Sequence, residues 1–185
     1  MKTIYFVTNN MGKVREAKAL LEKLGIDAQQ LAYEYPELQS DDLEEIAKYG
    51  AKHAAMHLKK PVIVEDAGLF ISALNGFPGP YSSFTFKRIG NEGILKLMRD
   101  VKDRKAQFRS VVGYCAPGKE TITFSGAVEG EISHEPRGRS GFGYDPIFLY
   151  GDRTFAQMST EKKNEVSHRC IALRRFAEWL QKNNE

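Results

Sequence analysis

Apolar residues in the first part of the chain follow a strand-like spacing and then a helical one. The run at 3–8, TIYFVT, is rich in β-branched and aromatic residues and predicts a strand. It stops at the polar run 9–13, after which apolar residues between Val14 and Leu24 recur at helical spacing. Gly25 stands where the C-cap of this helix belongs. The pattern therefore predicts a strand, a polar loop and a helix.

A second strand and a second helix are predicted next. Residues 26–31 form a short strand-like run, and the irregular stretch 32–40 separates it from the helix. Asp41 is expected to cap this helix, with Glu44 completing a capping box. Gly50 lies in the middle of the helix, where glycine costs roughly 1 kcal/mol relative to alanine. We therefore expect close packing or ligand approach at Gly50.

The next apolar run ends in two carboxylates. Val62, Ile63 and Val64 lack polar alternation, which predicts a strand covered on both faces. Glu65 and Asp66 follow at the predicted end of this strand, the edge at which open α/β sheets bind ligands. Ala67-Gly68 permits close backbone approach, and two glycines and two prolines pre-shape the loop 75–80. By themselves these residues fit a walled site and a solvated acidic turn equally well.

The second half of the chain adds strands that turn back on themselves. Two short helices and two strands are predicted, at 83–89, 94–101, 105–115 and 120–133. The strands turn at Pro117-Gly118, which is typical of a hairpin and makes the sheet mixed. The chain closes with a helix whose buried stripe includes Phe176 and Leu180. The fold class predicted is α/β, with a central mixed sheet flanked by helices.

Composition narrows the class of protein. The 185 residues, 42% of them hydrophobic and 28% charged, predict one globular domain over 1–185. The net charge of +3 is spread along the chain and does not indicate a nucleic-acid partner. Cys115 and Cys170 have no metal-type spacing, and no run resembles a signal peptide or a membrane span. We expect a cytoplasmic protein without a membrane partner.

Three polar segments carry the candidate chemistry. Residues 8–13 precede a helix, whose free N–H groups and dipole favour an anion there, although the spacing is not that of a P-loop. A glycine-rich loop runs into Phe142-Gly-Tyr-Asp145, and the segment 159–169 gathers lysines, a histidine and an arginine ahead of the closing helix. His53 and His57 lack the glutamate of a zinc motif and are interpreted as an exposed helix flank.

Together these segments resemble the inosine triphosphate pyrophosphatase family, hydrolases of non-standard purine nucleoside triphosphates. The resemblance rests on four pieces in family order: TNNMGK at 8–13, VEDAG at 64–68 with NGFPGPY at 75–81, FGYD at 142–145 and KNEVSHR at 163–169. They span nearly the whole chain, and the four together are highly specific.

The resemblance implies an elongated α/β fold with two lobes around a nucleotide cleft, and a homodimer. It implies Mg²⁺-dependent hydrolysis of ITP, dITP or XTP to the monophosphate and pyrophosphate. Glu37 and Asp66 would hold the metal, and Asp66 would be the catalytic proton acceptor. The implied nucleotide contacts are Thr8, Asn9, Asn10, Met11, Gly12, Lys13, Ala67, Phe142, Gly143, Tyr144, Asp145, Lys163, His168 and Arg169. One departure is Gly50, where many relatives carry a lysine.

Elementary chemistry agrees with a metal. Attack of water at phosphorus needs charge neutralisation and a positioned nucleophile, and magnesium supplies both by bridging phosphate oxygens and acidifying a water. Magnesium usually takes one or two carboxylates, which Glu37 and Asp66 match. Neighbouring side chains of an extended segment point to opposite faces, so we expect Asp66 to face the site and Glu65 to have a supporting or structural role.

Base selection requires separate residues. Arg169 and His168 are candidates for donors to a six-keto oxygen, which adenine lacks, and Phe142 or Tyr144 for stacking on the purine or for core packing. Guanine must be rejected at its two-position, by a residue that the pattern does not single out. Three alternatives remain at this point: hydrolysis of another non-standard nucleotide, a non-catalytic nucleotide sensor, and, with the least support, a nucleic-acid-binding module.

Overall fold

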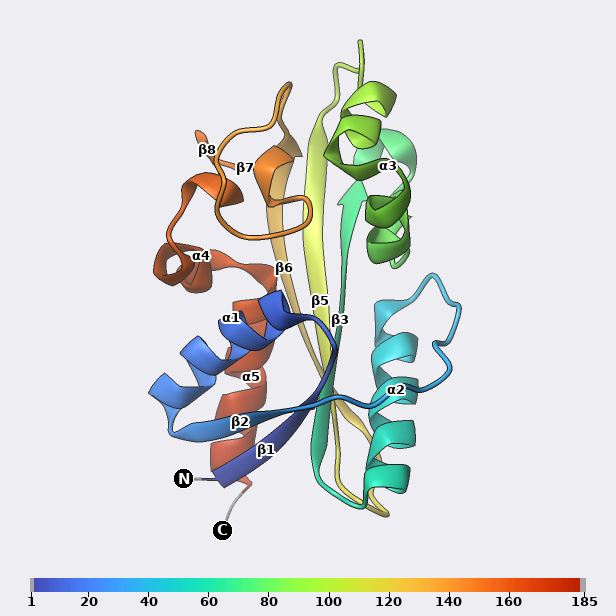
Figure 1. The fold of residues 1–185 in the computed structure, drawn as a ribbon, viewed down its shortest axis with the longest axis vertical. Coiled ribbons are helices and arrows are strands. Elements are labelled where there is room, and N and C mark those ends of the chain that lie inside the picture. Colours follow the sequence, from blue (N-terminus) through green and yellow to red (C-terminus); the bar gives the residue numbers. More distant parts are fainter. Residues whose placement is uncertain (1, 184–185) are drawn as a thin grey trace. The chain divides into compact units, whose positions relative to one another are not determined.

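The computed structural model describes residues 2–183 and begins with the predicted strand, helix, strand and helix (Figure 1). β1 (Lys2–Val7) leads into α1 (Met11–Leu21), and a 3-10 turn then ends at Gly25, which has a left-handed φ of 75°. β2 (Ile26–Leu31) has the expected bounds. α2 (Leu43–Leu58) follows an irregular segment at 32–42. The strand and helix periods in the sequence therefore predicted these elements closely.

The chain divides into two compact units. The first contains the chain up to Asp66, Ser110–Gly126 and the chain from His168 onward. The second contains Ala67–Arg109 and Ala127–Ser167. Three strands contribute residues to both units: β3 (Val62–Ile71), β5 (Lys105–Cys115) and β6 (Ile122–Ile132). The expectation of a single domain over 1–185 stays a prediction beside this division.

In the first unit, a sheet lies between two helical layers. β1 pairs in parallel with β2 and with β3, as expected for an α/β fold. One set of alternating residues packs with α1 and α5 (His168–Lys182): Ile4, Phe6 and Ile63. The other set packs with α2: Tyr5, Val7, Val62 and Val64. Because successive strand residues point to opposite faces, each face of the sheet has its own apolar core.

The second unit is built around antiparallel pairs. β4 (Pro78–Gly79) pairs with β3, and β7 (Phe148–Tyr150) pairs with β6 and β8 (Arg153–Thr154). Its helices are α3 (Ser82–Leu97) and α4 (Thr160–Val166). The core packs aromatic rings from three segments, with Phe108 and Phe148 centred 4.5 Å apart. With the parallel pairs of the first unit, these pairs confirm a mixed sheet.

Several predicted boundaries were wrong. β3 continues through Glu65 and Asp66 instead of ending there, because the strand pairs onward with β4. The N-cap of α2 is Asp42, whose carboxylate accepts a hydrogen bond of 2.8 Å from the Glu44 N–H. The break predicted at Gly90 between two short helices is confirmed by its non-helical φ of 57° and ψ of −163° within α3, but the second helix ends at Leu97 instead of Val101.

The segment before the closing helix is also more regular than expected. Residues 160–166, interpreted as part of a charged approach to the helix, form α4, which is capped by the Ser159 side chain. His168 and Arg169 are the first two residues of α5, so their backbone positions are fixed by that helix. No helix in the described residues has the length and apolar character needed to cross a bilayer.

Candidate active site

The loop between β1 and α1 is arranged by its own asparagine and threonine. Asn10 is the N-cap of α1, and its side-chain oxygen accepts from the Gly12 N–H at 2.9 Å and the Lys13 N–H at 3.2 Å. The Asn10 N–H donates to the Thr8 hydroxyl at 3.1 Å. Two N–H groups expected to be free for an anion are thus capped. The loop still presents polar atoms and the positive end of the helix dipole.

Lys13 points from α1 to the strand that carries the carboxylates. Its Nζ donates to the Glu65 carbonyl oxygen at 2.8 Å and forms an ion pair with the Glu65 carboxylate at 2.9 Å. The other Glu65 oxygen accepts from the Ser110 hydroxyl at 2.6 Å and from the Arg169 Nε at 3.1 Å. Arg169 also forms an ion pair with Glu16. Two cations and two carboxylates from three elements, α1, β3 and α5, therefore form one network.

Burial and neighbouring charges shift the pKa values of Glu65 and Arg169 in opposite directions. Burial alone would raise the pKa of Glu65, but the charges of Arg169 and Lys13 and the hydrogen bonds from Ser110 and Lys13 hold it well below its usual value. Burial would lower the pKa of Arg169, and the charges of Glu65 and Glu16 raise it instead. Glu65 and Arg169 therefore both stay charged, and Glu65 is a poor proton acceptor.

Asp66 lies on the other face of the same strand. It follows Val62 and Val64 in alternation, and these two residues pack toward α2. There it acts on the Tyr35 phenol: burial, then the charge of Asp66, then that of Glu37, raise the pKa of Tyr35 to about 12. Glu65 lies on the opposite face of β3 from Asp66, as expected, while the prediction that Glu37 and Asp66 hold a metal stays a prediction.

In the second unit, Asp145 organises the glycine-rich loop. Its carboxylate accepts from the Phe142 N–H at 2.9 Å and from the Lys163 Nζ at 2.6 Å, with both side chains of that ion pair buried. The Lys163 Nζ lies 5.0 Å from the centre of the Phe142 ring. Three residues that the sequence singled out are therefore in contact: Phe142 and Asp145 from the loop, and Lys163, which lies 18 positions after Asp145.

The other predicted residues of this unit make contacts that hold the fold together. Tyr144 is only 4% exposed, belongs to the apolar core and donates its hydroxyl to the Ser82 carbonyl at 3.1 Å. Of the two aromatic residues considered for stacking on a purine, Tyr144 therefore packs in the core. The Gly143 carbonyl accepts from the Asn91 side chain at 3.2 Å. Ala67 lies on β3, directly after Asp66.

Sequence reasoning missed three residues that these groups require. Glu16 and Ser110 are buried partners of Arg169 and Glu65, and Tyr35 is the phenol whose pKa the charges of Asp66 and Glu37 raise. Glu16 carried a weak signal, since it lies one turn after Lys13 on a helix and interrupts its apolar face. Ser110 and Tyr35 carried none, because their importance depends on which segments the fold brings together.

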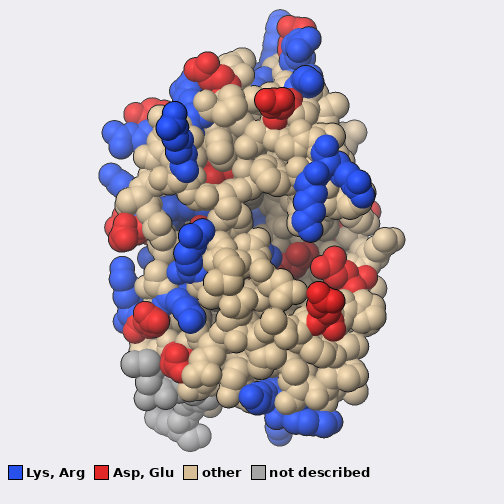
Figure 2. Space-filling model, in the orientation of Figure 1, with Lys and Arg blue, Asp and Glu red and all other residues tan. Residues whose placement is uncertain are grey.

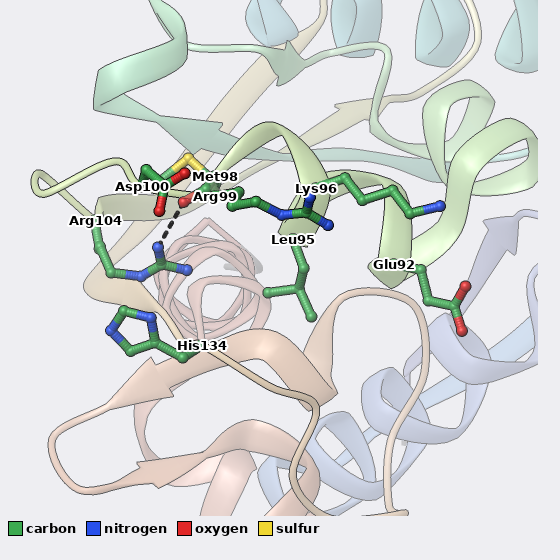
Figure 3. Close-up of a pocket in the computed structure, with 8 residues that line it drawn as sticks. All are labelled: Glu92, Leu95, Lys96, Met98, Arg99, Asp100, Arg104 and His134. Carbon is green, nitrogen blue, oxygen red and sulfur yellow. Dashed lines mark hydrogen bonds between the residues drawn. The ribbon is translucent and has the colours of Figure 1, made fainter.

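A pocket in the second unit lies away from these residues. It measures about 420 Å³, and Figure 3 shows the eight residues that line it, among them Arg104 and His134. None of the predicted site residues lines this pocket. Three Arg104 nitrogens donate to backbone carbonyls of Met98, Ile132 and Ser133, which accounts for that guanidinium structurally. On the face drawn in Figure 2, acidic and basic side chains are interspersed.

Comparison with known families decides the relationship of this chain. The model of the Ham1 family matches residues 4–179. The chain belongs to the Ham1 family. The resemblance inferred from the four sequence motifs is thereby confirmed. In this Ham1 family member, the matched region contains both the Lys13 network and the Asp145 group.

Individual relatives agree with this over nearly their full length. A protein from Methanopyrus kandleri named dITP/XTP pyrophosphatase is 57% identical over 182 residues, which are 97% of each chain. One of the same name from Methanosarcina mazei is 53% identical, over 97% of this chain and 98% of its own. The Staphylococcus aureus Ham1 protein has a TM-score of 0.85 at 34% identity, covering 99% of this chain and 100% of the other. A HAM1 protein from Coxiella burnetii has a TM-score of 0.87 at 32% identity, covering 98% and 100%.

Proposed function

We propose that this protein hydrolyses non-standard purine nucleoside triphosphates, namely dITP, ITP and XTP, to the monophosphate and pyrophosphate. The observation that carries the proposal is the identity of more than half of the residues, over nearly the whole chain, to relatives named dITP/XTP pyrophosphatase. The carboxylates Glu37 and Asp66 and the Lys13 network support it, because they supply the charges that such a reaction needs. The enzyme would act on free nucleotides of the cytoplasm.

Divalent metal binding fits the side chains of the first unit. The charges of Asp66 and Glu37 both raise the pKa of Tyr35, and both carboxylates are the hard oxygen ligands that Mg²⁺ prefers. Within the described residues no three His, Cys, Asp or Glu side chains gather around one point. A site with two carboxylates suits magnesium, which leaves its other positions to water and substrate phosphate. Bound there, Mg²⁺ would neutralise phosphate charge and polarise the α-phosphate.

The roles of the chain's own residues follow from their charges and positions. Asp66 would accept the proton of the water that attacks the α-phosphorus, while the bond to the bridging oxygen breaks and pyrophosphate leaves. Glu65 cannot share this task, because two cations hold it ionised on the opposite face. The loop 8–13 would hold phosphate oxygens at the start of α1.

Nucleotide contacts in the other segments stay predictions from the resemblance. Phe142 is half-buried beside Lys163 and is the better candidate for stacking on a purine, since Tyr144 packs in the core. Arg169 is only 3% exposed and is held by Glu16 and Glu65. A contact between Arg169 and the base therefore has to be tested together with its role in this network.

A panel of nucleotides tests the proposed reaction. We expect pyrophosphate release from dITP, ITP and XTP with Mg²⁺, far slower release from ATP, GTP and dUTP, and loss of release in EDTA. Pyrophosphate and orthophosphate are measured separately, because orthophosphate as the product would place the attack away from the α-phosphate. Selective turnover of dUTP would favour a different base class, and binding of ITP without turnover would favour a nucleotide sensor.

We also propose that the enzyme is a homodimer, as the family resemblance implies. Exposed aromatic side chains near the start of α3 support a protein contact there: Phe77, Tyr81 and Phe84, which are 41%, 42% and 62% exposed. We expect light scattering with size exclusion to give twice the chain mass of 20.9 kDa. Phe84→Glu should shift the equilibrium toward the monomer if this surface is the interface, whereas a monomeric wild-type protein would contradict the proposal.

A further inference from the structure

Asn91 follows a break in α3 and contacts the glycine-rich loop. The break is at Gly90, whose φ of 57° and ψ of −163° belong to a region that is essentially open to glycine alone. A Cβ placed on Gly90 would meet nothing within 4 Å beyond its chain neighbours, so backbone conformation, and not packing, calls for glycine here. Because the helix is interrupted, the direction of the Asn91 side chain is not set by the first half of α3.

The Asn91 amide is used for the loop and not for the helix. Its Nδ2 donates to the Gly143 carbonyl oxygen at 3.2 Å, across 52 positions of the sequence. An asparagine near the start of a helical segment ordinarily turns its side-chain oxygen to the N–H groups of the first turn. Here the Asn91 Oδ1 is buried and accepts no hydrogen bond from the described residues. A buried oxygen in this state costs free energy, so the contact with Gly143 is made at the expense of the helix.

Gly143 is held by this hydrogen bond more than by packing. Its φ of 61° is left-handed, and a Cβ placed on it would meet nothing within 4 Å beyond its chain neighbours. The loop is anchored on both sides of Gly143. Before it, the Phe142 N–H donates to the Asp145 carboxylate at 2.9 Å. After it, the Tyr144 hydroxyl donates at 3.1 Å to a backbone carbonyl at the start of α3. The Asn91 amide therefore fastens the peptide between two anchored residues.

We propose that Asn91 is a positioning residue for the loop 142–145 and thereby for the purine of the substrate. The inference rests on the proposed function, because it assumes that Phe142 stacks on the base. Phe142 directly precedes Gly143 and is half-buried beside Lys163, whose Nζ lies 5.0 Å from the ring centre. Without the Asn91 contact the nucleotide would have to order the loop on binding, which lowers affinity for the purine. Binding of phosphates at the loop 8–13 should not depend on Asn91.

The kinetics of Asn91→Ala separate positioning from a structural role. Alanine favours a helix and removes the buried oxygen, so the thermal unfolding midpoint should stay at the wild-type value or rise. The KM for dITP should rise about tenfold, the upper range for loss of one hydrogen bond, while kcat changes less than about twofold. Pyrophosphate, which has no base, should inhibit with the wild-type Ki. Gln181→Ala is the matched control, because the Gln181 Nε2 donates to the Leu24 carbonyl at 3.1 Å and likewise joins remote segments.

Asn91→Asp replaces the first variant if that one does not fold. It keeps the side-chain volume but presents an acceptor to the Gly143 carbonyl, so the KM for dITP should rise at least as much. A wild-type KM in a folded variant would overturn the inference and leave the proposed function intact. Equal increases in the KM for dITP and the Ki of pyrophosphate would also overturn it, because they would show a general disturbance. If the wild-type protein released no pyrophosphate from dITP, the proposed function would fail and the inference with it.

Discussion

Replacing Asp66 with asparagine is expected to lower kcat for pyrophosphate release from dITP by roughly 10³-fold or more. The change keeps the shape of the side chain but removes both a metal ligand and the proposed proton acceptor. Asp66 lies on the face of β3 that packs toward α2, the face that also carries Val62 and Val64. The measurement is steady-state pyrophosphate release at saturating Mg²⁺, with the thermal unfolding midpoint recorded to confirm that the variant is folded.

Glu65→Gln is the matched control, because it makes the same chemical change one residue earlier. Glu65 is buried against Lys13, Ser110 and Arg169 and does not face the carboxylate pair. Its loss should lower stability and alter the position of Lys13, with a smaller decrease in kcat than in the Asp66 variant. Equal losses of turnover in two folded variants would contradict the assignment of different roles to the two carboxylates.

Arg169→Met is expected to lower the free energy of unfolding by about 3–5 kcal/mol. Methionine retains much of the side-chain length but leaves Glu16 and Glu65, each 5% exposed, with one cation fewer between them. Chemical denaturation measures the change. Lys52→Met serves as the control, since the Lys52–Glu120 pair is solvent-exposed at 3.7 Å and is expected to contribute less than about 1 kcal/mol. Similar losses in both variants would show that the buried network contributes little.

The same variant predicts a change in acid stability. The folded pKa of Glu65 lies below its usual value of 4.5, so the unfolded chain takes up the proton first as the pH falls. The stabilisation from Glu65 is present above pH 4.5 and is lost as the pH falls toward the folded pKa. Without Arg169 the pKa of Glu65 is lowered less, so the free energy of unfolding should depend less steeply on pH in this acidic range. If Arg169 also contacts the base, the ratio of ITP to ATP turnover falls as well.

The sequence predicted the elements better than their junctions. The spacing of apolar residues and the capping residues were enough to predict β1, α1 and β2, because these signals lie within each element itself. The end of β3 was predicted too early, since its pairing partner Pro78–Gly79 lies in a loop that carries no strand signal. The N-cap of α2 was misplaced by one residue because two consecutive aspartates fit the same pattern.

The candidate site was predictable where the residues follow one another and unpredictable where they meet in space. The opposite orientations of Glu65 and Asp66 follow from strand geometry, which is local. Arg169 and Glu16 are 153 positions apart, and the sequence of neither helix indicates that the two side chains will pair. Tyr35 was missed for the same reason, although the unexplained Gly50 already indicated that something must lie against α2.

The alternation along β3 also limits how this strand can change. Inserting one residue between Val64 and Glu65, or deleting Val64, would exchange the two carboxylates between the faces of the sheet. Glu65 would then lie on the face toward α2, away from Lys13 and Arg169, and Asp66 would lie on the face toward α1 and α5. We therefore expect that an insertion or deletion of one residue at this point of β3 abolishes activity. The exposed turn at Pro117-Gly118, which connects β5 and β6, is free of that constraint and is a suitable position for an inserted tag.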